Sequence, residues 1–225
     1  DCKVITKDGI GSVKAKIGET EVTLQENETY SVKDGKLVTV VAAIEDEVYF
    51  SIEDAIVAAE AGDTVTLLKD ITVDMGDKDA AAIAITKNLT LDRNGKTIAA
   101  NKIDAKEGMG HILGIQGANV KVKDLTIDGA DKSARHGIQV YGEGSKVTLT
   151  SVTVKDCYGY GLVVNGATAT ATRLTTDGNG WGGVNVTKGA NIDKAPSFTL
   201  NSGTLSEENP IQADNVNKSA PNVKW

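Results

Sequence analysis

Between Gly137 and Asn185 the sequence repeats itself, and this repeat constrains the fold more than any other feature. The segment consists of GIQVYGEGSKVTLTSVTVKDCYGY, then GLVVNGATATATRLTTDGNGWG, then GVN. Each copy carries three short runs of alternating apolar residues, separated by Gly, Ser, Asn and Asp. Alternation with period two is typical of β-strands, and self-similarity at a period of about 20 to 30 residues is typical of stacked repeats. We therefore predict a parallel β-helix.

Alignment of the copies predicts which side chains stack on one another. Ile138 aligns with Leu162 and then with Val184. Within each strand we expect the first and third residues to point into the core, and the residue between them, such as Gln139 or Asn185, to point outward. Aromatic residues make up only 4% of the chain, which suits a narrow core of stacked aliphatic side chains.

Similar runs continue the pattern on both sides of the repeat. Earlier coils are expected to start at Ile83 and Ile112, and a partial sixth coil at Ile211. The asparagines near turns, Asn88, Asn119 and Asn165, are expected to be structural, because stacked Asn commonly forms a ladder in such coils. His111, in GMGHIL, is expected to end a loop.

A short amphipathic helix is predicted just before the first coil. Ser51 with Asp54 three residues later approximates a capping box, apolar residues then follow at helical spacing, and Gly62 can end the helix. The helix is therefore predicted at about residues 51–61. An open β-helix exposes apolar core and unpaired strands at its end, so a helix at this place suits a cap.

The strings YFSIEDAI, from Tyr49 to Ile56, and AGDTVTL, from Ala61 to Leu67, resemble the N-terminal cap and first coil of right-handed β-helix modules. Such modules belong to the pectate-lyase-like superfold and recur in bacterial cell-surface and secreted proteins. The resemblance covers about Tyr49 to Asn215. It implies an all-β, right-handed parallel β-helix and an extracellular or bacterial cell-surface location. It says little about activity, because the superfold hosts lyases, hydrolases, esterases, adhesins and inert stalks.

Two domains are expected. Residues 1–44 form a small β lead-in segment, either a separate antiparallel subdomain or irregular strands, and residues 45–225 form the β-helix domain with its cap helix. At the other end of the chain, Val223 and Trp225 are expected to fold over the last coil. The alternative is that the tail links to a downstream domain.

The loops that enter the first strand of each coil carry most of the side chains suited to binding. Four of the few aromatic residues would stack there on one side of the molecule, with hydrogen-bonding neighbours. An apolar sugar face packs on a ring and its hydroxyls need polar partners, whereas rings that only cover the loop backbone are the structural alternative. The predicted ligand-binding residues are Arg135, His136, Gln139, Tyr141, Tyr158, Tyr160, Trp181 and Asn185.

We therefore expect a non-catalytic surface or secreted β-helix module that binds a glycan, or adheres to a host or neighbouring cell surface. One alternative is a carbohydrate-active enzyme, a polysaccharide lyase or glycoside hydrolase, with Arg135, His136, Asp156 and Asp177 as catalytic candidates. The signature strings of the polygalacturonase branch, such as Asn-Thr-Asp and Arg-Ile-Lys, are missing. The other alternative is a pure structural spacer.

No cofactor is expected, and calcium is the one metal considered. Asp128, Asp131 and Asp177, with Asn179, offer hard oxygen ligands in loops. Asp-Gly at 128–129 and 177–178 is equally ordinary turn chemistry.

Charge and cysteine content limit the partners. The net charge is -7, so we expect no nucleic-acid partner. No apolar run is long enough to span a membrane, and a monomer is expected. Cys2 and Cys157 have no metal-type spacing, and Cys2 is either a lipid-attachment remnant or a free cysteine.

Overall fold

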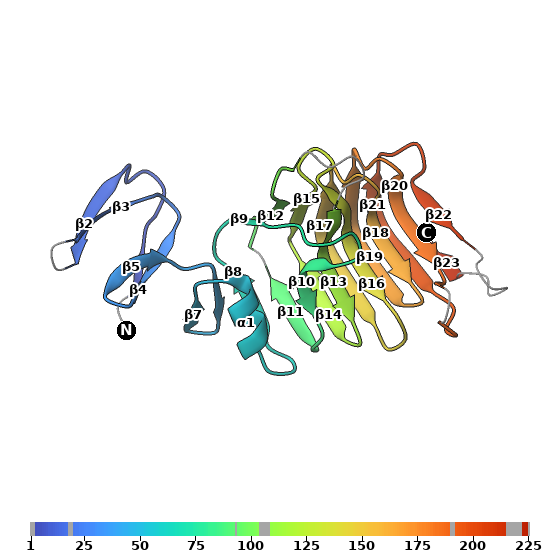
Figure 1. The fold of residues 1–225 in the computed structure, drawn as a ribbon, viewed down its shortest axis with the longest axis horizontal. Helices are drawn as coiled ribbons and strands as arrows, with labels where there is room; N and C mark the ends of the chain where they lie inside the picture. The colour runs from blue at the N-terminus through green and yellow to red at the C-terminus, as the bar shows by residue number, and fades with distance from the viewer. Residues whose placement is uncertain are drawn as a thin grey trace.

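The computed structural model describes residues 3–17, 20–92, 94–103, 109–189, 192–214 and 222–224. Most of its strands belong to one stack of coils, which Figure 1 shows in sequence order from α1 toward the C-terminal end. The lead-in strands lie at the opposite end of the molecule from the C-terminus. Cys2 and Trp225 lie outside the described residues.

One face of the stack is a six-stranded sheet in which every pair of strands is parallel. Ile138 of one strand pairs with Leu162 of the next, and Leu162 pairs with Val184. This register confirms the predicted columns of aligned residues. The strands, in order across the sheet, are β10 (Ala81–Ile85), β13 (Met109–Gln116), β16 (Ala134–Tyr141), β18 (Tyr160–Asn165), β20 (Gly182–Thr187) and β22 (Ile211–Ala213).

A twelve-stranded sheet forms the other faces. Its coil strands are β8 (Thr64–Leu67), β9 (Ile71–Val73), β11 (Leu89–Asp92), β12 (Thr97–Ala100), β14 (Asn119–Lys123), β15 (Thr126–Asp128), β17 (Lys146–Lys155), β19 (Thr168–Asp177), β21 (Ser197–Leu205) and β23 (Asn222–Lys224). In the later coils two predicted runs merge into one bent strand. Ser151 in β17 and Arg173 in β19 adopt positive φ at the bend, and β17 pairs with both β14 and β15.

The core alternates along each strand as the pattern predicts. In β17, Val147, Leu149, Val152 and Val154 are fully buried, whereas the threonines between them are partly exposed. Full burial of one such aliphatic side chain contributes about 1.5–3 kcal/mol. These side chains form one continuous cluster from α1 to the last coil. The tail adds to this cluster, because Val223 in β23 pairs with Phe198 and packs against the cluster.

Helix α1 (Ile52–Ala58) covers the N-terminal end of the stack. Its N-cap is Ser51, whose Oγ accepts a hydrogen bond from the Asp54 N–H at 3.0 Å, and its residues Ile52, Ala55 and Ile56 are buried in the core. The helix is shorter than predicted, since extended backbone at Ala59 ends it before Gly62. Lys87 then donates to the Val57 and Ala59 carbonyls, at 2.5 and 2.9 Å.

The lead-in residues form antiparallel sheets of their own. β1 (Lys3–Ile5), β4 (Thr29–Lys33) and β5 (Lys36–Thr39) make a three-stranded sheet, and β2 (Val13–Ile17) pairs with β3 (Thr20–Leu24). A separate small core holds Leu24, Tyr30 and Leu37.

Two short strands connect the lead-in to the stack. β6 (Ala42–Ile44) pairs antiparallel with β7 (Glu47–Tyr49) and with β8. The predicted lead-in range therefore ends in a strand of the twelve-stranded sheet, and the domain boundary at residue 44 stays a prediction.

Candidate functional site

The loops before β16, β18 and β20 stack in register, and this stacking brings aromatic side chains together. The Tyr158 N–H donates to the Ala134 carbonyl at 2.9 Å, and the Trp181 N–H donates to the Gly159 carbonyl at 3.0 Å. Gly159 leaves the space that the neighbouring ring needs, because a Cβ at this position would lie 2.5 Å from Cε1 of His136.

The result is a continuous group of rings, which we call the ring cluster: His111, His136, Tyr158, Tyr160 and Trp181. The centroids of His111 and His136 lie 5.2 Å apart with nearly parallel planes, and those of His136 and Tyr160 lie 5.8 Å apart. The Trp181 ring stands edge-on to His136, Tyr158 and Tyr160, with centroid distances of 5.5 to 5.7 Å.

His111 was not predicted to join this group. It lies within strand β13 instead of ending a loop, and it pairs in register with His136 of β16. A signal was present in the sequence, since His111-x-Leu113-x-Ile115 has the same spacing as His136-x-Ile138-x-Val140.

Both histidines are buried and neutral. Burial, then the neighbouring His111 and Arg135, lowers the pKa of His136 to about 3, and its Nδ1 accepts a hydrogen bond from the Tyr160 N–H at 2.9 Å. Burial likewise lowers the pKa of His111 to about 4. Neither ring nitrogen of His111 has a hydrogen-bond partner among the described residues. These rings therefore act as packing elements at neutral pH.

Trp181 forms the exposed edge of the ring cluster. Its side chain is 38% exposed, and the guanidinium carbon of Arg135 lies 5.0 Å from its ring centroid. Beside Trp181 is a hollow of about 330 Å³, which we call the Trp181 hollow. Its other lining residues are Asp177, Gly178, Asn179, Gly180, Gly182, Ser206, Glu207, Glu208 and Asn209.

A second depression of about 470 Å³, the Tyr141 groove, runs over the outer surface of the six-stranded sheet. Small residues make it hollow, since a Cβ on Gly114 would lie 2.6 Å from the Cβ of Ala81. Tyr141 is 39% exposed and pairs in register with Gln116 and Asn165. The groove is lined by Asp79, Ala81, Ala84, Thr86, Gly114, Ile115, Gln116, Gln139, Tyr141 and Asn165.

The predicted binding residues thus separate into three groups. Arg135, His136, Tyr158, Tyr160 and Trp181 meet at the ring cluster, while Gln139 and Tyr141 line the Tyr141 groove. The third group is a single residue that is held within the fold.

That residue is Asn185. It is only 4% exposed, and its Nδ2 donates to Oδ2 of Asp214 at 2.8 Å. Asp214 also accepts from Gln212, whose Oε1 accepts from the Tyr160 hydroxyl at 2.5 Å. Asn185 therefore links strand β20 to the residue that follows β22, at the C-terminal end of the six-stranded sheet. Asn165, expected to be only structural, lines the Tyr141 groove while its Oδ1 accepts from the Gly189 N–H at 2.7 Å.

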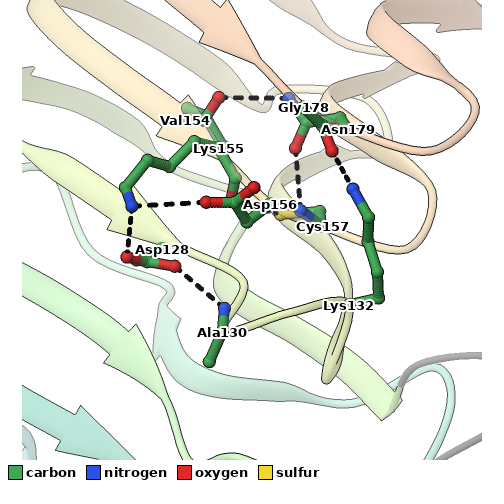
Figure 2. A network of polar contacts seen from close by, with 9 residues as sticks. All are labelled: Asp128, Ala130, Lys132, Val154, Lys155, Asp156, Cys157, Gly178 and Asn179. Atoms are coloured by element: carbon green, nitrogen blue, oxygen red, sulfur yellow. Dashed lines mark hydrogen bonds and ion pairs between the residues drawn. The ribbon is translucent and has the colours of Figure 1, made fainter.

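The acidic candidates are mostly engaged in ion pairs (Figure 2). Lys155 Nζ lies 2.7 Å from Oδ2 of Asp128 and 3.3 Å from Oδ2 of Asp156. The hydrogen bond to Asp128 is the main cause that raises the pKa of Lys155. Asp131 pairs with Lys102 at 2.5 Å on the surface, and Asp177 lies exposed at the end of β19. Within the described ranges, no three His, Cys, Asp or Glu residues converge so as to hold a metal ion.

Asn179 has a structural role that the sequence did not indicate. Its Oδ1 accepts from the Cys157 N–H at 3.0 Å, and its Nδ2 donates to the Val154 carbonyl at 3.1 Å and to Oε1 of Glu207 at 2.6 Å. Figure 2 shows its side chain reaching from the loop of Gly178 to Cys157 and Val154. Cys157 itself is a free, fully buried thiol whose pKa is raised by burial, so it is unreactive.

The part of the chain that the structure describes contains no helix with the length and apolar character needed to cross a bilayer.

Comparison with known proteins identifies the family. The family model described as the right-handed β-helix region matches residues 43–201, well over half of the chain. Searches of curated proteins and of solved structures gave no match. The parallel register, the continuous core and this match agree, and the chain belongs to the right-handed β-helix family.

Proposed function

We propose that this chain is a non-catalytic module of a bacterial surface or secreted protein. It binds a glycan on the outer surface of the six-stranded sheet and on the loops that lead into this sheet. The observation that carries the proposal is that two partly exposed rings, Trp181 and Tyr141, each stand at a hollow lined by polar groups.

The Tyr141 groove has the composition that sugar binding needs. A sugar presents an apolar face, which packs on an aromatic ring, and hydroxyls, which need donors and acceptors. Tyr141 supplies the ring, and amides from Gln116, Gln139 and Asn165 surround it. Because these residues come from adjacent parallel strands, the groups repeat at the strand spacing of about 4.8 Å, which suits a chain of similar sugars.

The contacts and pKa values of the candidate catalytic groups support binding without catalysis. A general base works best with a pKa near the operating pH, whereas His136 has a pKa of about 3 and its Nδ1 already accepts a backbone hydrogen bond. Arg135 packs on Trp181, and Asp156 lies beside Lys155.

A glycan array, followed by calorimetry and a sugar-release assay on the whole chain, tests the proposal. Tyr141→Ala and Trp181→Ala are each expected to lower the affinity for a bound glycan about tenfold, which corresponds to about 1.4 kcal/mol. Val57→Ala is the control, because Val57 is 74% exposed on α1 and lines neither hollow.

Binding with no sugar release supports the proposal. Release of sugar would favour the carbohydrate-active enzyme, and no binding at all would favour the structural spacer. Thermal melting of each variant shows whether a lost signal reflects lost binding or lost structure.

A further inference from the structure

The charges around both hollows restrict the kind of glycan that fits them, and this inference rests on the proposed function. Among the described residues that line the Tyr141 groove, the single ionised side chain is the carboxylate of Asp79. The lining of the Trp181 hollow includes three carboxylates, those of Asp177, Glu207 and Glu208, and neither Lys nor Arg.

The cations closest to the loops are held by other groups. The Arg135 guanidinium lies over the Trp181 ring, and Lys155 lies between Asp128 and Asp156. Lys132 donates to the Gly178 carbonyl. Each of these cations therefore already has a partner among the described residues.

The carboxylates of the Trp181 hollow differ in how they are held. Glu207 accepts from the Thr176 hydroxyl and from Asn179, both at 2.6 Å, so its position is fixed by the fold. Asp177 and Glu208 are exposed. A cation on a ligand can approach this exposed pair, whose negative charge attracts it.

A polyuronate would meet the opposite situation. It carries one negative charge per sugar, and like charges on the two surfaces repel each other. The net charge of the chain, -7, adds to this repulsion at low salt.

We infer that the glycan bound at this face consists of sugars without acid groups, and that a sugar with a protonated amine binds more tightly than its neutral counterpart. The site thus selects in the order amino sugar, neutral sugar, uronate.

The test is an array of amino-sugar, neutral and uronate oligosaccharides, followed by calorimetry at low and high salt with glucosamine and N-acetylglucosamine oligomers. These two oligomers share one backbone and differ in charge. At low salt the glucosamine oligomer is expected to bind about fivefold more tightly, the upper end for an exposed ion pair, and high salt should abolish this difference.

Single substitutions test which carboxylates cause the preference for the glucosamine oligomer. Glu208→Gln and Asp177→Asn should each reduce the preference for glucosamine while leaving the neutral oligomer unaffected. Glu53→Gln removes the same charge from the exposed first turn of α1 and should leave the preference unchanged. An equal effect of Glu53→Gln would show that the net charge acts, not the Trp181 hollow, and would overturn the inference.

Two other outcomes also contradict the inference, and they can be distinguished from each other. Uronates that bind as tightly as the other sugars would overturn the inference and leave glycan binding intact. An array with no signal for any sugar would remove the proposed function, and the inference with it.

Discussion

The coiled body and the lead-in strands are both built of short strands, but they pair these strands in different ways. In the body each coil strand pairs in parallel with the coil before and after it, so that Ile138, Leu162 and Val184 lie in one column. In the lead-in, neighbouring strands form antiparallel pairs, such as Lys33 with Lys36 across one tight turn. Parallel stacking repeats the same side-chain position at every layer, and hairpins do not.

This difference explains where the candidate site lies. A ring at one register position of a strand is followed by another ring one coil later, as for His111, His136 and Tyr160. The described lead-in strands bring together Leu24, Tyr30 and Leu37 to make a core, and their antiparallel pairing does not stack equivalent positions in a column. The body is therefore the region in which a surface for an extended ligand can form.

The largest expected effect separates the two cores. Leu162→Ala should destabilise the body by about 2–5 kcal/mol, because it leaves a cavity in a fully buried column. Both tryptophans lie outside the lead-in, so tryptophan fluorescence during urea unfolding reports the body. Leu37→Ala should leave that transition in place while changing the circular dichroism of the β-sheet. A shift of the tryptophan transition by Leu37→Ala would mean that the two regions unfold as one unit.

The second effect concerns contact between coils. Gly159→Ala places a methyl group 2.5 Å from His136 Cε1 and 2.8 Å from the Arg135 carbonyl, and such overpacking costs about 1–3 kcal/mol. The fluorescence of Trp181 should change as well, since the ring cluster must shift. The lead-in counterpart is Gly35→Ala, where φ is +73° and the space is open, so it should strain one hairpin and leave Trp181 unaffected. Unchanged fluorescence in Gly159→Ala would contradict the described packing.

The third effect is a pH dependence of the body's free energy of unfolding. The unfolded chain binds protons on His111 near the ordinary pKa of 6.5, but the folded chain does so only near pH 4. The unfolded state therefore holds more protons in this window, and the free energy of unfolding falls as the pH falls, by up to about 1.4 kcal/mol per pH unit for each such histidine.

His111→Phe keeps a ring in the stack and removes this titration. The variant should lose stability less steeply than the wild type between about pH 6.5 and 5, where most carboxylates stay ionised. Urea unfolding at several pH values measures the slope. Identical slopes for the two proteins would mean that His111 is accessible to protons in the folded chain. Asp79 and Arg135, the charged groups that act on His111, are present in both proteins.

The smallest expected effect is at the cap between the two regions. Lys87→Met removes the donor to the Val57 and Ala59 carbonyls and should cost about 1 kcal/mol. The loss should appear in the tryptophan transition, because α1 packs on the body. Lys14→Met, which breaks an exposed ion pair with Glu21 in the lead-in, should leave that transition unchanged.

Much of the body could be predicted because its pattern repeats. The alternation at Val147 and Leu149, and again at Val152 and Val154, follows from the period of a strand. The ends of α1 were less predictable, since the helix stops at Ala58 where Lys87, from a later coil, binds its last carbonyls.

The site was predicted in part, for a physical reason. Ring positions shared by successive coils follow from the alignment, as for His136 and Tyr160. The burial of Asn185 depends on Asp214, which follows strand β22, and the depth of the Tyr141 groove depends on Ala81 lying against Gly114. Neither contact has a local signature in the sequence.

The in-register coils also determine how such a surface could change in length. Leu162 follows Ile138 by 24 residues, and Val184 follows Leu162 by 22, and each strand offers the same edge to the next. Duplicating one such segment would insert a layer without altering the hydrogen bonds on either side. Under the proposed glycan binding, the number of sugar units in contact with the protein would then increase stepwise with gene duplication, so selection for longer or shorter polymers could act without a new fold.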